Sequence, residues 1–312
     1  MRIVDLIGCM GWVAAFLAAI AAIPVAGLFV GLLTPLPFIY YVSGLPFRHA
    51  AQFVALVVGI LVAVAMAAGL HRLALFCLEF GALGLALSQL FQRQASIGRV
   101  IFYGTAVLMG VGLLVIVVTA VAYHTGPLDV IKTYLDRNLR MSFEAYQSMG
   151  IPPEKAAEIK AYGDLLRRTV LQIYPALMTI GSAFVVWVNV LLSLRLFRAK
   201  ARHPEQWDRL SDWSAPERLV WGVIVSGFSL FLPFPSIRFI AINLLLILMT
   251  AYLFQGIAIL SHFLNRFGAP GWLRVVIYFF ISVQQFFLAL LALAGLFDQW
   301  VNFRRIGKGN TA

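Results

Sequence analysis

Long apolar runs separated by short polar segments make up the pattern of this chain. Nine such runs lie at about 6–23, 25–42, 51–69, 73–91, 100–123, 169–194, 218–232, 237–262 and 273–297. Roughly 20 apolar residues suffice for a helix to cross a lipid bilayer. Within each run the apolar positions are continuous rather than alternating, which favours helices over the strands of a β-barrel. We therefore predict an all-α fold, a polytopic transmembrane helical bundle with eight or nine spans.

The segment 124–168 differs in kind from the rest of the chain. It holds six acidic and seven basic residues, and its apolar positions recur at helical spacing, at Val130, Ile131, Tyr134, Leu135 and Leu139. This pattern predicts an amphipathic helix. The stretch "GIPPEKAAEI" at 150–159 then predicts a break and a new helix, because proline is tolerated in a first turn. The segment is either a helical extramembrane insertion or a pair of helices lying at the membrane interface.

The pattern divides the chain into six parts. We predict N-terminal transmembrane helices, about five, over 1–123 and an amphipathic helical insertion over 124–168. A transmembrane helix over 169–198 and a basic cytoplasmic loop over 199–217 follow. The remainder is predicted to be C-terminal transmembrane helices over 218–303 and a basic tail over 304–312.

Charge sets the expected orientation, because cytoplasmic loops of membrane proteins carry an excess of Lys and Arg. A cytoplasmic N-terminus places the loops that contain Arg48, Arg93 and Arg99 inside, together with the basic loop, and the near-neutral insertion outside. Nine spans would put the basic tail outside, against this rule. The run at 218–232 is the shortest and is interrupted by Pro and Gly. It is therefore the run least expected to cross the membrane. The count therefore stays at eight or nine.

Composition agrees with a membrane protein. Hydrophobic residues make up 62% of the 312, charged residues only 12%, and the mean hydropathy is +0.90. Soluble domains are nearer 45–50% apolar and about 25% charged. The net charge of +11 is explained by bases that flank spans on the cytoplasmic side, and no basic tract with interleaved aromatics indicates nucleic-acid binding. We expect membrane lipids and no nucleic acid among the partners, and a multi-pass protein of a bacterial cytoplasmic membrane.

One acidic residue, Glu79 in "LFCLEFGALG", lies in the middle of an apolar run. An ionisable residue inside a span is costly and is a functional candidate by default. It could contact a substrate or cation, or relay a proton. It could equally be a structural residue that is paired with an Arg or a hydroxyl, or that is protonated.

Amides and prolines within the runs supply the other candidates. Asn189 and Gln255 could line a polar cavity or make interhelical hydrogen bonds. Pro35 and Pro37 interrupt the second run, and interrupted helices often border the binding sites of transporters. Glu79, Pro35, Pro37, Asn189 and Gln255 are thus the predicted substrate-binding residues.

Nothing in the sequence indicates catalysis. The five His are scattered, the two Cys are not in C-x-x-C spacing, and no Walker loop or nucleophile motif is present. We therefore expect no enzymatic activity, no cofactor, no metal and no ATPase within the chain.

Several stretches resemble the YybS-like membrane proteins, a bacterial family of unknown function. They are "IPVAGLFVGLLTPLPFIYYVSG", "MGIPPEKAAEI" leading into "LLRRTVLQIYPALMTIGSAFVVWVNVLLSLRL", "LFQGIAILSHFL" and "GLFDQWVNFRR". That family is itself similar to the membrane-embedded substrate-binding subunits of energy-coupling-factor vitamin transporters. The likeness implies a small-molecule pocket among the early spans. This chain departs from those subunits in its insertion before the sixth span and in its extra C-terminal helices.

Two functions fit these observations. The first is an integral membrane protein that acts as a small-molecule-binding or transport subunit and depends on an energising or other membrane partner protein. The alternative is a membrane scaffold or assembly protein that binds partners or anionic lipids through its basic loop and its insertion.

Overall fold

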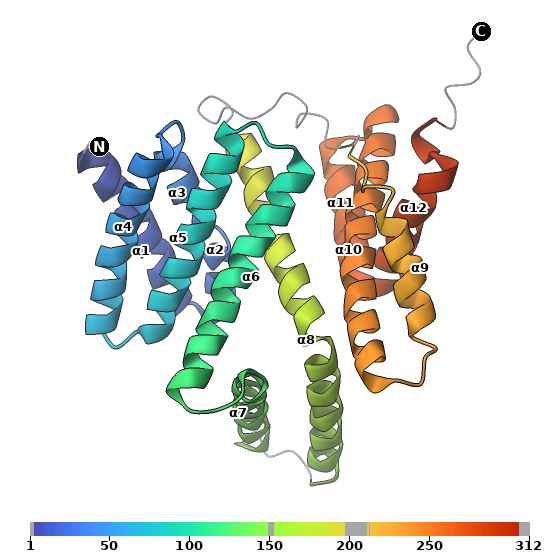
Figure 1. The fold of residues 1–312 in the computed structure, drawn as a ribbon, viewed down its shortest axis with the longest axis horizontal. Helices are drawn as coiled ribbons and strands as arrows, with labels where there is room; N and C mark the ends of the chain where they lie inside the picture. Colours follow the sequence, from blue (N-terminus) through green and yellow to red (C-terminus); the bar gives the residue numbers. More distant parts are fainter. Residues whose placement is uncertain (1–2, 149–152, 197–210, 212, 306–312) are drawn as a thin grey trace. The chain divides into compact units, whose positions relative to one another are not determined.

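The computed structural model describes residues 3–148, 153–196, 211 and 213–305, and every regular element within them is helical. This confirms the all-α prediction. The elements are α1 Ile3–Ala22, α2 Pro24–Gly31, α3 Pro35–Val42, α4 Phe47–Ala67, α5 His71–Gln92, α6 Ile97–Ala122, α7 Pro127–Ser148, α8 Pro153–Leu196, α9 Leu219–Ser229, α10 Pro235–Arg266, α11 Gly271–Val283, α12 Gln285–Val301 and the 3-10 helix η2 Phe303–Arg305 (Figure 1).

Six helices of the described residues are long and apolar enough to cross a membrane: α1, α4, α5, α6, α8 and α10. The pair α11 and α12 makes a seventh if the two count as one span, but their axes bend by 101° at the break between them. The runs predicted at 25–42 and 218–232 form only short helices. Length and composition therefore confirm a multi-pass helical protein, whereas the predicted eight or nine spans are not confirmed.

The chain folds into two compact units. Unit 1 comprises Met1–Leu171 and Gly181–Pro204, and unit 2 comprises Gln172–Ile180 and Glu205–Ala312. Helix α8 contributes to both, with its two ends in unit 1 and its middle in unit 2. Unit 1 thus contains the helices α1 to α7, and unit 2 contains α9 to α12.

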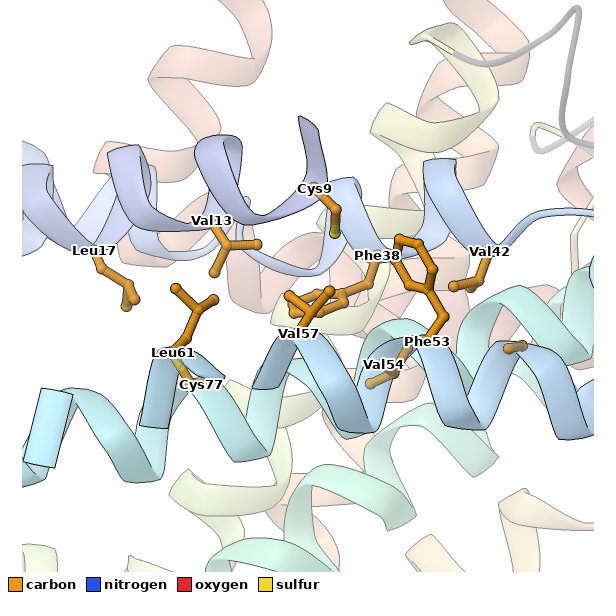
Figure 2. Packing of buried hydrophobic residues seen from close by; sticks show 11 residues of the cluster. Cys9, Val13, Leu17, Phe38, Val42, Phe53, Val54, Val57, Leu61 and Cys77 are labelled. Carbon is orange, nitrogen blue, oxygen red and sulfur yellow. The ribbon is translucent and has the colours of Figure 1, made fainter. Parts of the chain in front are cut away.

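An apolar core holds the first helices of unit 1 together. Side chains of α1, α3, α4 and α5 interdigitate there (Figure 2), and the central ones include Cys9, Val13, Phe38, Phe53 and Val57, all at most 1% exposed. Both cysteines, Cys9 and Cys77, are free thiols within this core. They pack as small apolar residues, as their positions in the sequence indicate.

Helices α2 and α3 together return along α1 in the opposite direction. A Cβ atom on Gly31 would lie 3.0 Å from Ile20 near the end of α1, and one on Gly8 near its start would overlap Tyr41 of α3. Residues 32–34 form a turn between α2 and α3, and Pro35 occupies the first turn of α3, where a missing N–H is tolerated. The prolines therefore begin a helix rather than kink one.

The predicted amphipathic helix is α7. Its least exposed stripe contains Ile131, which is buried, and Leu135 and Leu139, which are half-buried, at a spacing of four residues. The predicted second helix begins at Pro153, but α8 then continues to Leu196, so the boundary predicted at 168 falls inside one helix. Arg167 of α8 donates hydrogen bonds to both carboxylate oxygens of Asp136, which joins α7 to α8 within unit 1.

Close backbone contact between α10 and α12 forms the centre of unit 2. A Cβ atom on Gly256 would overlap the carbonyl oxygen of Leu291, and one on Gly295 would overlap that of Tyr252. Only glycine at both positions lets the two helices approach so closely. Helix α9 also packs on α10, where Gly222 meets Leu248 and Val220 joins an apolar cluster with Tyr252 and Leu296.

Candidate functional site

Four buried polar side chains of unit 1 have an atom without a hydrogen-bond partner among the described residues. These atoms are Thr34 Oγ1, Ser88 Oγ, Thr105 Oγ1 and Asn189 Oδ1. Thr34, Ser88 and Asn189 are 0% exposed and Thr105 is 9% exposed. A buried polar group without a partner costs about 1–3 kcal/mol, so such groups require an explanation.

Other hydroxyls of the same chain satisfy themselves on their own helix. Thr169, Thr179, Ser193, Ser226, Ser229, Thr250 and Ser282 each donate to a carbonyl three or four residues earlier. This local bond is the usual solution for Ser and Thr in membrane helices. Ser88 of α5 and Thr105 of α6 do not make it. Their hydroxyls are therefore free to bond with something outside the chain.

The three helices that hold Ser88, Thr105 and Asn189 are in contact with one another. A Cβ atom on Gly104 of α6 would lie 3.2 Å from Leu87 of α5 and 2.9 Å from Val186 of α8. Ser88 and Thr105 directly follow Leu87 and Gly104, and Asn189 lies three residues beyond Val186. We call Thr34, Ser88, Thr105 and Asn189 the polar layer. Most other buried residues of these helices are apolar; Ser193 of α8 is buried too, but its hydroxyl bonds to its own helix.

Asn189 connects the polar layer to the break between α2 and α3. Its Nδ2 donates to the carbonyl oxygen of Leu32 at 2.8 Å and to that of Val185 at 2.9 Å. Pro35 and Pro37 are buried at the start of α3, and the Pro35 carbonyl would lie 3.1 Å from a Cβ on Gly84 of α5. Three of the predicted substrate-binding residues, Pro35, Pro37 and Asn189, thus belong to one region of unit 1.

An apolar pocket of about 200 Å³ adjoins this region. Ile20, Phe29, Gly31, Leu32 and Phe76 line it, from α1, α2 and α5. Leu32 belongs to both features, since it lines the pocket and its carbonyl oxygen accepts from Asn189. A molecule with an apolar part and a neutral polar part would find complementary surfaces here.

Glu79 lies apart from the polar layer. It is half-buried on α5, nine residues before Ser88, and makes no hydrogen bond or ion pair with any described residue. Nine residues are two and a half helical turns, which puts Glu79 about 13 Å from Ser88 along the axis and on the opposite side of the helix.

Gln255, the fifth predicted residue, belongs to a separate buried network in unit 2. Its Nε2 donates to Asp298 Oδ2 at 2.9 Å, and its Oε1 accepts from the Ala215 N–H at 3.0 Å. Gln299 Nε2 donates to the Ala215 carbonyl and to Gln255 Oε1. The interhelical hydrogen-bond interpretation of Gln255 therefore fits the geometry.

Asp298 holds the end of the described chain in place. Its Oδ1 accepts from the backbone N–H of Phe303 at 2.8 Å, and Arg304 Nη2 lies 3.9 Å from its Oδ2. The same Nη2 donates to the carbonyl of Trp213 at 2.6 Å. Asn302, with a φ of +49°, makes the left-handed turn that directs η2 back towards Trp213. Hydrogen bonds thus join the segment before α9, at Trp213, to η2, which follows α12.

The side chain of Asn243 on α10 bonds to two backbone groups of α8 in unit 2. Pro175 stands inside α8, and the next residue, Ala176, donates its N–H to Asn243 Oδ1 at 2.9 Å. Asn243 Nδ2 donates to the Gln172 carbonyl at 2.9 Å. Ala176 and Gln172 are four residues apart and would otherwise bond to each other, so the amide bridges a helix opened at proline.

The residues that the structure describes contain no group of three or more His, Cys, Asp and Glu side chains placed to hold a metal ion. The candidate features are the polar layer with its pocket in unit 1 and, in unit 2, the network around Gln255 and Asp298 and the amide of Asn243.

Comparison with known protein families shows to which family the chain belongs. The family described as "Predicted membrane protein (DUF2232)" matches residues 12–299, and the chain belongs to this family of membrane proteins. The match includes residues of both units. No curated protein and no solved structure matches the chain.

Proposed function

We propose that this protein is a small-molecule-binding or transport subunit of a bacterial cytoplasmic membrane, with its site at the polar layer of unit 1. The observation that carries the proposal is the set of four buried hydrogen-bonding atoms without partners. Seven helical hydroxyls elsewhere bond within their own helix, which those of Ser88 and Thr105 do not; outside the layer, the buried atoms without a partner among the described residues are Tyr252 Oη and Arg304 Nε of unit 2.

The chemistry of the layer favours a neutral solute. Hydroxyls of Thr34, Ser88 and Thr105 can both donate and accept, and Asn189 Oδ1 accepts. None of these groups is charged, so an anion or cation would meet no counter-charge there. The adjoining apolar pocket suits an apolar portion of the same molecule. Glu79, being distant, has no part in this proposal.

Transport would require an external source of energy, because the sequence has no nucleotide-binding motif and no catalytic machinery. A partner protein that couples to an ATPase would supply it. The sequence resemblance to YybS-like proteins, and through them to energy-coupling-factor substrate-binding subunits, supports such a partner by analogy of fold.

We further propose eight crossings and a re-entrant hairpin. Besides the six long helices, α2–α3 returns along α1 and α9 pairs with α10, each as a short crossing. The contact between Arg304 and Trp213 supports one membrane face for the tail and the basic loop, with α11–α12 entering and leaving from that face. This arrangement keeps the bases of the tail inside, in agreement with the positive-inside rule. Most of the basic loop and tail lies outside the described residues.

A scaffold role is the second candidate, favoured by α7 and the start of α8. These helices extend beyond the other helices of unit 1 in Figure 1 and expose Tyr134, Met141 and Tyr162. Such a surface would suit a partner protein or the lipid interface.

Metabolite release from the purified protein tests the first proposal. We expect mass spectrometry of the denatured protein to detect a neutral small molecule that is reduced at least ten-fold in Ser88→Ala/Thr105→Val. Ser193→Ala is the matched control, because its hydroxyl bonds to its own helix, and it should retain the molecule. Equal amounts of the molecule in the wild type, the double variant and the control would remove the support for a solute site and favour the scaffold role. Absence of any such molecule from the wild type would do the same.

A further inference from the structure

Asn189 differs from the other members of the polar layer, because the structure fixes which hydrogen bonds it can still make. Its Nδ2 lies 2.8 Å from the carbonyl oxygen of Leu32 and 2.9 Å from that of Val185. Carbonyl oxygens only accept, so the amide nitrogen must face them, and both of its hydrogens are used. The remaining atom, Oδ1, can only accept, and it is buried without a partner among the described residues.

The break between α2 and α3 explains why the amide is held in this orientation. In a continuous helix the Leu36 N–H would bond to the Leu32 carbonyl, but here it bonds to the Leu33 carbonyl at 2.9 Å. Asn189 donates to the Leu32 carbonyl that the break releases. The nitrogen of this amide therefore has a structural role, and that role fixes the position of the oxygen.

Two other buried amide oxygens show what Asn189 Oδ1 lacks. Asn243 Oδ1 accepts from the Ala176 N–H at 2.9 Å. Gln255 Oε1 accepts from the Ala215 N–H at 3.0 Å. Both are paired with a donor of the chain, whereas Asn189 Oδ1 is not, although Asn189 is 0% exposed. A buried acceptor without a donor is costly, so the missing donor is to be sought outside the described chain.

The hydroxyls of the layer do not impose the same requirement. Ser88 and Thr105 can rotate, and each could donate to a carbonyl of its own helix, as other hydroxyls of this chain do. Asn189 has no such alternative, because turning its oxygen away would break both bonds of its nitrogen. Asn189 is therefore the residue of the layer that specifies the chemistry of the solute.

The apolar pocket indicates the rest of the solute. Leu32 lines this pocket and accepts from Asn189, and the pocket is also lined by Phe29 and Phe76. An apolar cavity of roughly 150 Å³ can hold benzene. The pocket of about 200 Å³ is therefore large enough for a body of one ring.

We propose that the solute is a neutral, mainly apolar molecule that donates a hydrogen bond from an O–H or N–H group to Asn189 Oδ1. The proposal rests on the proposed function and narrows it to one substrate class. Alcohols, phenols and N–H heterocycles belong to this class. Ethers, esters and fully alkylated amides do not, because they carry no donor.

Pairs of isomers test the requirement for a donor without changing the size of the probe. The probes are p-cresol, which has an O–H, and its isomer anisole, which has none; 3-methylindole and 1-methylindole repeat the comparison for an N–H. Isothermal titration calorimetry of the full chain in lipid nanodiscs measures binding, and empty nanodiscs correct for partitioning into lipid. In the wild type we expect the donor isomer of each pair to bind at least roughly ten-fold more tightly, because the other isomer leaves a buried acceptor unpaired.

Asn189→Leu should bring the two affinities of each pair to within about two-fold of each other, because it removes the acceptor. Asn243→Leu, the same replacement at a buried asparagine of unit 2, is the matched control and should keep the preference. The comparison in the wild type decides the proposal by itself if Asn189→Leu does not fold.

Three results would overturn the proposal. Equal binding of the isomers to the wild type would refute the donor requirement and leave the solute site standing. A preference that persists in Asn189→Leu would assign it to another group. Binding of neither isomer of either pair would count against the pocket itself, and so against the proposed function as well.

Discussion

The side-chain amide of Asn243 on α10 accepts a hydrogen bond from the backbone N–H of Ala176 on α8, at 2.9 Å. It also donates to Gln172, so one residue satisfies both polar groups that are separated beside Pro175. In a lipid environment neither group has water as an alternative partner. The pair shows how the backbone groups of Ala176 and Gln172 keep partners beside a proline inside a helix of 44 residues.

Asn243→Leu should therefore destabilise unit 2. The replacement leaves an N–H and a C=O unpaired, each at about 1–3 kcal/mol, and a lower melting temperature in detergent would report the loss. Adding Pro175→Ala should recover part of it, because removal of the proline ring lets the Ala176 N–H bond directly to the Gln172 carbonyl. Asn138→Leu, on the exposed surface of α7, is the control and should change little. Strict additivity of the two substitutions would contradict the coupling.

The glycine contact between α10 and α12 gives a second prediction. Gly295→Val forces a side chain against the Tyr252 backbone, which cannot yield as a flexible side chain could. We expect the free energy of unfolding to fall by more than the usual cost of overpacking, which is about 1–3 kcal/mol. Thermal stability in detergent, or aggregation as the detergent is varied, measures the loss. Gly227→Ala in α9, with nothing within 4 Å of the added Cβ, should be neutral or mildly stabilising. Equal effects at the two sites would mean that the close contact is absent.

Asp298 provides a third prediction, on topology. Asp298→Ala removes the acceptor for Gln255 and Phe303, which should free the C-terminal segment from Trp213. This is tested by limited proteolysis of right-side-out and inverted membrane vesicles. Cleavage near 302–305 should occur only in inverted vesicles, which expose the cytoplasmic face, and should be faster in the variant than in the wild type. Glu217→Ala, at an exposed acid before α9, is the control. Cleavage from the opposite face would contradict the re-entrant hairpin.

The ion pair between α7 and α8 predicts a dependence on acid. The hydrogen bond from Arg167 lowers the pKa of Asp136 below its ordinary value. Because the pKa of Asp136 is lowered in the folded protein, the ion pair stabilises the contact between α7 and α8 at pH values above the ordinary carboxyl pKa near 4. This stabilisation is lost as the pH falls through the pKa of Asp136 in the folded protein. Hydrogen exchange of α7 should therefore be constant between about pH 8 and 5 after correction for intrinsic rates, and should rise below about pH 4. Asp136→Asn should remove the step; a step in that variant would assign it elsewhere.

The apolar pattern predicted the helical fold and most helix positions, because the lipid requirement for continuous apolar helices leaves a strong signal. It could not predict which short runs cross, because that depends on tertiary contacts. The return of α2–α3 along α1 is recognised only because Gly8 of α1 meets Tyr41 of α3 and Gly31 of α2 meets Ile20 of α1.

The candidate site was predicted in part. Asn189, Pro35 and Pro37 stood out as polar or helix-breaking residues in apolar runs, and the structure brings them together. Ser88 and Thr105 were missed, because hydroxyls are common in membrane helices and only geometry shows which of them bond to their own helix. Asp298 lies near the end of the last apolar run and is not among the predicted residues, yet it is 8% exposed and central to a network. Glu79, the most conspicuous residue in the sequence, has no described partner.

Direct observation of the polar layer tests the central claim. The measurement is a cryo-electron microscopy map of the protein purified without added ligand, at a resolution that shows individual side chains. The account predicts non-protein density within hydrogen-bonding distance of Asn189 Oδ1 and of the hydroxyls of Ser88 and Thr105. Hydroxyls turned onto their own helix carbonyls, with closed packing and no such density, would contradict a solute site in unit 1.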